Sequence, residues 1–406
     1  MQISIPHKNS PLEHVTRAAG WSTKRAATVA FVSVIVYLLL IAYQVAPYGY
    51  NLTSLIRVGS TNPFYDPAIL GDGVVVFNDP KSGGDGYDGQ FYLYMIKGLL
   101  MGEDGISNPF RYQRILYPVV VYLFALGQPG LIPISMPLVN LLAISISSLL
   151  LWKLVRDFGL RPKYLFLYTL NIGFLVAVFY DVATPLCISL VVASIYFLVR
   201  ERLWLASAMM ALSLLTQENG AIVLAVVTGW LLAQRNLRGA IVFSCSVVPW
   251  TVWQLFLWLR EGKLPFIMSG NHFRPPFAGM ISYISAFEWA GDWQHMLRDA
   301  SVFPMMLFVT VLLVVSVFEM KRNPQVFTLL LVVHALVGVC FNKEQIWSST
   351  ISSPARALAG VFPFLVICYA QNPSRRLLLL IVLSVLLSLM GIARILLMPS
   401  HPYFVT

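Results

Sequence analysis

Acidic and basic residues that could do chemistry lie near one another in an otherwise strongly apolar chain. The segment GGDGYDGQFYLYMIKGLL, residues 83–100, contains Asp85 and Asp88. The segment NPFRYQRILYP, which follows it closely, contains Arg111 and Arg114. A carboxylate can accept the proton of a hydroxyl group, and the planar fork of a guanidinium matches the oxygens of a phosphate. These residue types would suit the transfer of a group from a phosphate-bearing donor to a hydroxyl.

The glycine-rich turn before Asp88 is expected to open a helix. Asp88 suits the N-cap position, and QFYLYMIKGLLMG continues with apolar residues at helical spacing until Lys97 and Gly102 mark the end. Asp88 could therefore be only a cap and Asp85 only a turn residue, or their carboxylates could face a ligand. A divalent metal could also be held by this pair, but two acids do not define a metal site, so we expect no required cofactor.

Three arginines are candidates for binding a phosphate. Arg111 and Arg114 are three residues apart, which places them on one face if the segment is helical. They could bind a donor phosphate, or they could anchor an interfacial helix among lipid headgroups. Arg356, which follows SSPA at the start of an apolar segment, could reach a phosphate or extend to the membrane surface. The residues expected to line the substrate pocket are Asp85, Tyr87, Gln90, Tyr92, Glu218, His272 and Arg274.

The composition indicates that the elements positioning these residues lie in a membrane. The chain is 58% hydrophobic and only 11% charged, with a mean hydropathy of +0.73, whereas a soluble domain has about 25% charged residues. The net charge of +10 would suggest nucleic acid in a soluble protein, but here it is expected to reflect basic cytoplasmic loops. We predict an all-α, multi-pass membrane protein, one transmembrane domain over residues 1–406, with the lipid bilayer and not nucleic acid as a partner.

Apolar segments of helical length recur along the chain and predict about 11 transmembrane helices. The first is too long for a cleavable signal and is expected to anchor the chain with its basic N-terminal end in the cytoplasm. The segments lie at 26–46, 134–155, 163–179, 182–199, 203–216, 221–234, 239–259, 303–319, 325–341, 355–370 and 377–397.

The distribution of basic residues orients these segments. With the N-terminus in the cytoplasm, every cytoplasmic connection is basic, as the positive-inside rule requires. The outer connections include two large periplasmic loops, 47–133 with surface helices and the candidate active site, and 260–302, which contains SGNHFRPPFAG. The basic residues of the cytoplasmic connections are Lys153, Arg156, Arg161, Lys163, Arg200, Arg202, Arg235, Arg238, Lys321, Arg322, Arg375 and Arg376.

Short apolar segments decide this orientation. The stretch ILYPVVVYLFALG, 115–127, is shorter than the about 20 residues that a span needs, so we expect it to lie on the outer membrane face. The segments 203–216 and 221–234 are also short. We expect two helices that meet at TQENG, which would leave Glu218 recessed. Asp181, at another short outer turn, is expected at the membrane interface.

Three motifs carry a family resemblance over roughly residues 25–235. GYDGQFY followed by RYQRILYP, together with ALSLLTQENG, resembles the GT-C superfamily of integral-membrane glycosyltransferases, and more closely the bacterial cell-surface glycopolymer formation proteins. The resemblance implies a polyprenyl-phosphate sugar as donor, Asp88 as the catalytic acid, and Arg111 or Arg114 as ligands of the donor phosphate. The chain has no WWDxG motif of oligosaccharyltransferases and no Asp-Glu dipeptide of the kind that protein O-mannosyltransferases carry. These departures disfavour protein N-glycosylation and protein O-mannosylation, and the expected acceptor is a cell-surface glycan or lipid.

The expected function is therefore glycosyl transfer with inversion, at the periplasmic face of a bacterial inner membrane. Asp88 would accept the proton of the acceptor hydroxyl, and the arginines would stabilise the leaving phosphate. One alternative is a polysaccharide ligase or polymerase whose chemistry lies around His272 and Arg274. Another is a transporter or flippase for a lipid-linked sugar, which would be expected to show broken helices, charges deep in its spans and internal repeats.

Overall fold

The computed structural model is predominantly helical. The two strands within the described residues, β1 (Val58–Gly59) and β2 (Val76–Phe77), form a short parallel pair. This confirms the all-α prediction. The structure describes residues 23–78, 84–102, 109–268, 272–287, 296, 299–343, 345–347 and 351–397.

Five helices in the described part of the chain are long and apolar enough to cross a membrane, so the protein is a multi-pass membrane protein. A sixth span would be a pair of helical segments, Pro162–Thr169 and Ile172–Phe179, that meet at a bend of 48°. The five long spans are formed by α1 (Thr23–Val45), α6 (Ile132–Val155), α12 (Leu237–Ser244) with α13 (Val247–Glu261), α16 (Val302–Arg322) and α20 (Arg375–Leu397).

Five further apolar helices are only 10–17 residues long. A span needs about 20 residues, so the count of 11 spans stays a prediction, although each of the predicted segments contains a helix. The helices of 203–216 and 221–234 are separate, as expected, because the backbone of Gln217 is extended between them. These short helices are α9 (Thr184–Val199), α10 (Leu203–Thr216), α11 (Gly220–Ala233), α17 (Val326–Val339) and α19 (Val361–Gln371).

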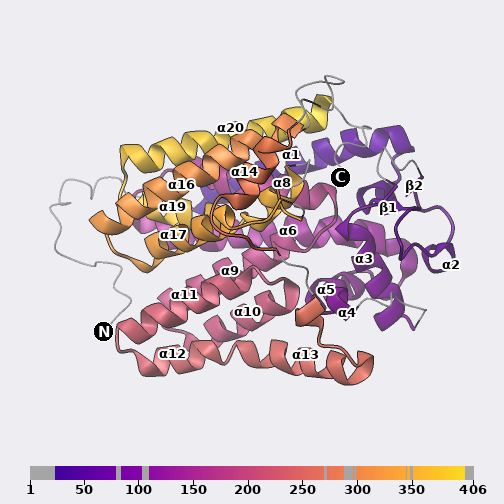
Figure 1. Ribbon diagram of the computed structural model, residues 1–406, viewed down its shortest axis with the longest axis horizontal. Coiled ribbons are helices and arrows are strands. Elements are labelled where there is room, and N and C mark those ends of the chain that lie inside the picture. Colours follow the sequence, from indigo (N-terminus) through magenta and orange to yellow (C-terminus); the bar gives the residue numbers. More distant parts are fainter. Residues whose placement is uncertain are drawn as a thin grey trace.

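The first large loop gathers at one end of the helical bundle, on the right in Figure 1. There the ammonium of Lys97 donates to the main-chain carbonyls of Ile69 and Leu70 and holds the loop together. The segment 115–127 forms a helix of only 9 residues, too short to span, and its place on the outer face stays a prediction. The loop contains α2 (Pro67–Leu70), α3 (Asp88–Met95), the π-helical turn Ile96–Leu100, α4 (Pro109–Tyr112) and α5 (Leu116–Phe124).

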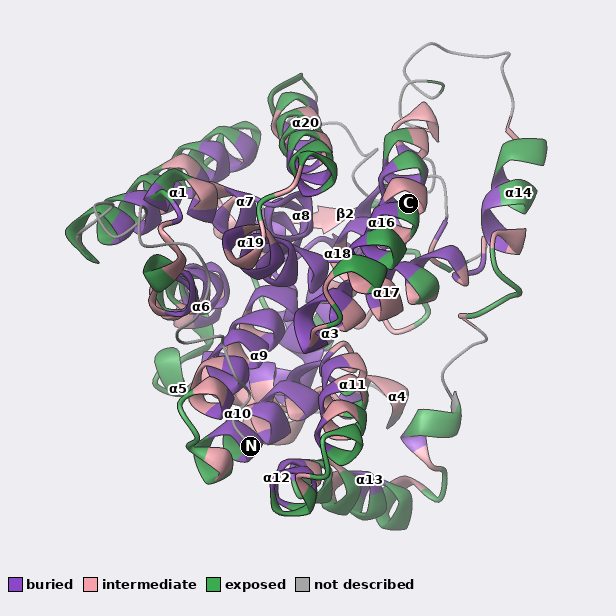
Figure 2. Cartoon of the chain, turned by 90° about the vertical axis from the view of Figure 1, so that its left-hand side faces the viewer, coloured by how far each residue is buried: buried purple, intermediate pink, exposed green. Residues whose placement is uncertain are grey.

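Buried residues fill the interior of the bundle, while exposed residues lie along its outermost helices (Figure 2). Phe31 of α1 is 65% exposed, Leu259 of α13 83% and Leu386 of α20 55%. In water such faces would be costly, so we expect them to contact lipid. The other α-helices in the described part of the chain are α7 (Phe166–Thr169), α8 (Ile172–Phe179), α14 (Ala278–Ser285) and α18 (Ser352–Ala357).

Candidate active site

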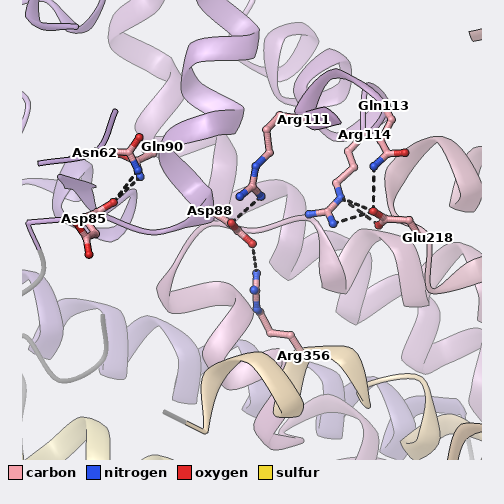
Figure 3. Close-up of polar contacts among 9 residues, drawn as sticks. All are labelled: Asn62, Asp85, Asp88, Gln90, Arg111, Gln113, Arg114, Glu218 and Arg356. Atoms are coloured by element: carbon pink, nitrogen blue, oxygen red, sulfur yellow. Dashed lines mark hydrogen bonds and ion pairs between the residues drawn. The ribbon is translucent and has the colours of Figure 1, made fainter. Parts of the chain in front are cut away.

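The carboxylate of Asp88 lies between two guanidinium groups (Figure 3). Nη1 of Arg111 donates to Oδ1 at 2.8 Å, and Nη1 of Arg356 donates to Oδ2 at 3.0 Å. The prediction that Asp88 is the N-cap of its helix is wrong, since Asp88 is the first residue of α3 and Tyr87 holds the cap position. The side chain is therefore engaged by distant arginines and does not serve the end of its own helix.

Close backbone packing places Asp88 at this point. A Cβ atom on the next residue, Gly89, would lie 2.4 Å from the carbonyl oxygen of Tyr180 and 2.7 Å from that of Ile56. Just before Asp88, Gly86 has a φ of +69°, a left-handed conformation that glycine adopts without steric cost. The glycine-rich turn thus lets the start of α3 press against two other segments of the chain.

A second ion pair lies beside the first. Arg114 binds Glu218 with two nitrogens, Nη2 to Oε1 at 2.8 Å and Nε to Oε2 at 3.1 Å, and Gln113 donates to the same carboxylate at 3.2 Å. Glu218 stands in the turn between α10 and α11, and 36% of its side chain is exposed. The structure therefore brings Arg111, Arg114 and Glu218 together at Asp88, with Arg114 held by the second carboxylate (Figure 3).

The arginines keep both carboxylates ionised. Burial alone would raise the pKa of Asp88, but Arg111, Arg356 and Arg114 lower it well below its ordinary value. Burial alone would likewise raise the pKa of Glu218, but Arg114 lowers it below its ordinary value. Three guanidinium groups face two carboxylates in this cluster, which leaves one excess positive charge. Such an excess in a partly buried site favours an anionic ligand.

Tyrosine rings lie against the cluster, and the expectation that Tyr87 and Tyr92 line a substrate pocket stays a prediction. The guanidinium of Arg356 lies 4.7 Å from the centre of the Tyr87 ring, on which the ring of Tyr180 packs at 4.2 Å. Burial raises the pKa of Tyr87 to about 12, so its phenol is neutral at pH 7. Tyr92 packs edge-on against Tyr117 at 5.0 Å. These rings surround the guanidinium and the start of α3 with rigid apolar surface.

Asp85 and Gln90 are occupied in holding the turn before α3. Thr61 donates to Oδ1 of Asp85 at 2.8 Å, and Nε2 of Gln90 donates to the main-chain oxygen of Asp85 at 3.1 Å. In Figure 3 both residues stand apart from the carboxylate of Asp88. The carboxylate of Asp85 thus accepts from Thr61, while that of Asp88 accepts from Arg111 and Arg356.

The second large loop lies against another part of the chain. The main-chain amide of Arg274 donates to the carbonyl of Cys340 at 2.7 Å, and the carbonyl of His272 accepts from the amide of Asn342 at 2.9 Å. Residues 269–271 lie outside the described residues. The described main-chain contacts thus tie His272 and Arg274 to residues 340–342. They do not tie them to the Asp88 cluster, which comprises Asp88, Arg111, Arg114, Glu218 and Arg356.

Sequence reasoning missed the burial of Arg57 and placed Asp181 too near the surface. Arg57 is 1% exposed, with its guanidinium 4.5 Å from the centre of the Phe77 ring, and its Nε and Nη1 have no hydrogen-bond partner among the described residues. Asp181 was expected at the membrane interface but is fully buried, and burial raises its pKa well above the ordinary value. A single arginine or aspartate at a turn carries no sequence signal that distinguishes burial from exposure.

No protein-family model, curated protein or solved structure matches this chain. The geometry around Asp88 is therefore the observation from which a function can be inferred.

Proposed function

We propose that this chain is a membrane glycosyltransferase that moves a sugar from a polyprenyl-phosphate donor to a cell-surface glycan or lipid, at the periplasmic face of a bacterial inner membrane. One observation carries the proposal: the carboxylate of Asp88 is held between Arg111 and Arg356, with the Arg114–Glu218 pair beside it. The same cluster offers a base for the acceptor and cations for the donor.

The arginines suit a phosphate because they already hold two oxygens of one anion. A phosphate could take the same two guanidinium groups by replacing the carboxylate oxygens of Asp88. The excess positive charge of the cluster would favour this exchange. While the donor is absent, the carboxylate oxygens of Asp88 thus occupy the positions that the phosphate oxygens would take.

Replacement of the Asp88 carboxylate by the donor phosphate on the arginines would also make Asp88 a stronger base. A carboxylate whose pKa is strongly lowered is a weak base, and Asp88 is in that state when both arginines bind it. A phosphate on the arginines would offset their positive charge, so the pKa of Asp88 would rise. Donor binding therefore precedes activation of the acceptor.

The chemical step follows from these positions. Asp88 accepts the proton of the acceptor hydroxyl, whose oxygen forms a bond to the anomeric carbon of the sugar. The bond from that carbon to the phosphate oxygen breaks with inversion, and its electron pair stays on the departing polyprenyl phosphate. Arg111 and Arg356 stabilise the charge that builds on that phosphate.

Replacement of Asp88 by asparagine tests the proposal. Purified Asp88→Asn should transfer sugar at least about a hundredfold more slowly than wild type. It should bind the donor at least as tightly, because the competing carboxylate is gone. Asp85→Asn is the matched control, since Asp85 bonds to Thr61 away from the cluster, and it should retain most activity. Transfer by Asp88→Asn at the wild-type rate would rule out Asp88 as the base, and movement of an intact lipid-linked sugar without transfer would indicate a flippase.

A further inference from the structure

An open surface cavity of about 430 Å³ lies at the opposite ends of α6 and α9 from the Asp88 cluster. The first turns of α6 adjoin the cluster through Tyr117, whose hydroxyl donates to the carbonyl of Met136 and whose ring packs on Tyr92. From Met136 to Lys153 is roughly 25 Å along a helix. The cavity is thus separate from the candidate active site. It is lined by Lys153, Arg156, Tyr196, Phe197, Arg200 and Arg202.

The lining is strongly basic and is poorly neutralised. Among the described residues the ion pair formed by the lining cations is Arg156 with its exposed neighbour Asp157 at 3.3 Å. The ammonium of Lys153 lies 5.9 Å and the guanidinium of Arg200 lies 5.6 Å from the centre of the Tyr196 ring. Two cations thus lie near one aromatic ring at the edge of the cavity. A bound anion would reduce the electrostatic repulsion between them.

Basic residues at these helix ends also follow from simpler causes. Cations are stabilised at helix C-termini and in cytoplasmic connections. Those causes explain the charge, but they do not require four cations around one cavity. Arg235 and Arg238, in another predicted cytoplasmic connection, satisfy the same rules and are not part of the lining.

Exposed apolar side chains that follow the lining residue Arg202 in the sequence indicate what kind of anion would bind. Trp204, two residues after Arg202, is 68% exposed, and Leu205 is 47% exposed. Tryptophan is enriched where a protein meets the lipid headgroups. Basic pockets between helices at the cytoplasmic side bind acidic headgroups. We propose that this cavity binds the phosphate-bearing headgroup of an anionic membrane lipid, whose acyl chains lie along Trp204 and Leu205.

Native mass spectrometry of the purified full chain tests this proposal, with phosphatidylglycerol and zwitterionic phosphatidylcholine as probes. Wild type should bind phosphatidylglycerol more tightly than phosphatidylcholine. The triple variant Lys153→Gln, Arg200→Gln, Arg202→Gln should lose that affinity by about tenfold or more. The matched control Arg235→Gln, Arg238→Gln, Arg322→Gln removes the same charge from exposed sites outside the lining and should lose little.

The outcomes separate the sources of the anion. An equal loss of phosphatidylglycerol affinity in both triple variants would mean that the lipid is attracted to positive charge anywhere on the protein. That result would overturn the proposal. Displacement of phosphatidylglycerol by millimolar inorganic phosphate would identify a soluble phosphate as the occupant and would overturn the lipid. Should the first triple variant fail to fold, Lys153→Gln and Arg200→Gln are compared singly with Arg235→Gln, and a selective loss of a few fold is expected.

Discussion

At the scale of single residues, the cluster depends on which carboxylate each arginine meets. The sequence pattern identified Asp88, Arg111, Arg114 and Glu218 as candidates from their local motifs. It could not predict their pairing, because Arg114 and Glu218 are 104 residues apart and their contact depends on how α10 and α11 pack. Such long-range contacts are not encoded in any short stretch of sequence.

Replacement of Arg356 should weaken donor binding selectively. Arg356→Ala removes a charge-assisted contact to phosphate, which should raise the Kd for the donor roughly ten- to a hundredfold. Arg356→Lys should recover only part of the affinity, since lysine lacks the planar fork. The measurement is donor binding by the purified protein. Arg274→Ala is the control, because its segment contacts residues 340–342, and an equal loss there would place the donor phosphate in the second loop.

At the scale of elements, the start of α3 depends on a glycine against two other segments. Gly89→Ala would put a Cβ atom 2.4 Å from a main-chain oxygen and should destabilise the protein by about 1–3 kcal/mol. Gly229→Ala, where nothing lies within 4 Å in a helix, is the matched control and should be neutral or slightly stabilising. Thermal unfolding of both variants is the measurement. Equal melting temperatures for wild type and Gly89→Ala would show that α3 can shift without cost.

Hydropathy predicted the positions of the helices along the chain better than it predicted how deeply individual polar residues are buried. The apolar segment predicted at 203–216 is the helix Leu203–Thr216 in the structure. Asp181 was misplaced because an average over neighbouring residues reports where apolar side chains are frequent, and not how deeply one turn is packed. Arg57 was missed for the same physical reason. The positions of segments could thus be predicted from composition, while the burial of individual polar groups required the packed structure.

At the scale of the whole molecule, orientation in the membrane is the main prediction that remains. A reporter fused after Arg156 should indicate the cytoplasm, and one fused near Asn271 should indicate the periplasm. The reason is the basic residues in every predicted cytoplasmic connection. Alkaline phosphatase and green fluorescent protein fusions are suitable reporters. A periplasmic signal after Arg156 would contradict the orientation and would mean that 115–127 crosses the membrane.

The contact between Asp88 and Arg356 joins residues 268 positions apart, and this separation has a consequence during synthesis. At about 5–20 residues per second, roughly 13–54 s pass between translation of the carboxylate and of its second arginine. During that interval the nascent chain already contains Arg111 but lacks α18. A ribosome that stops before residue 356 releases a chain in which Asp88 can pair with Arg111 but not with Arg356. Insertion of the early helices must therefore proceed without this contact, and the site becomes complete only after α18 has been synthesised.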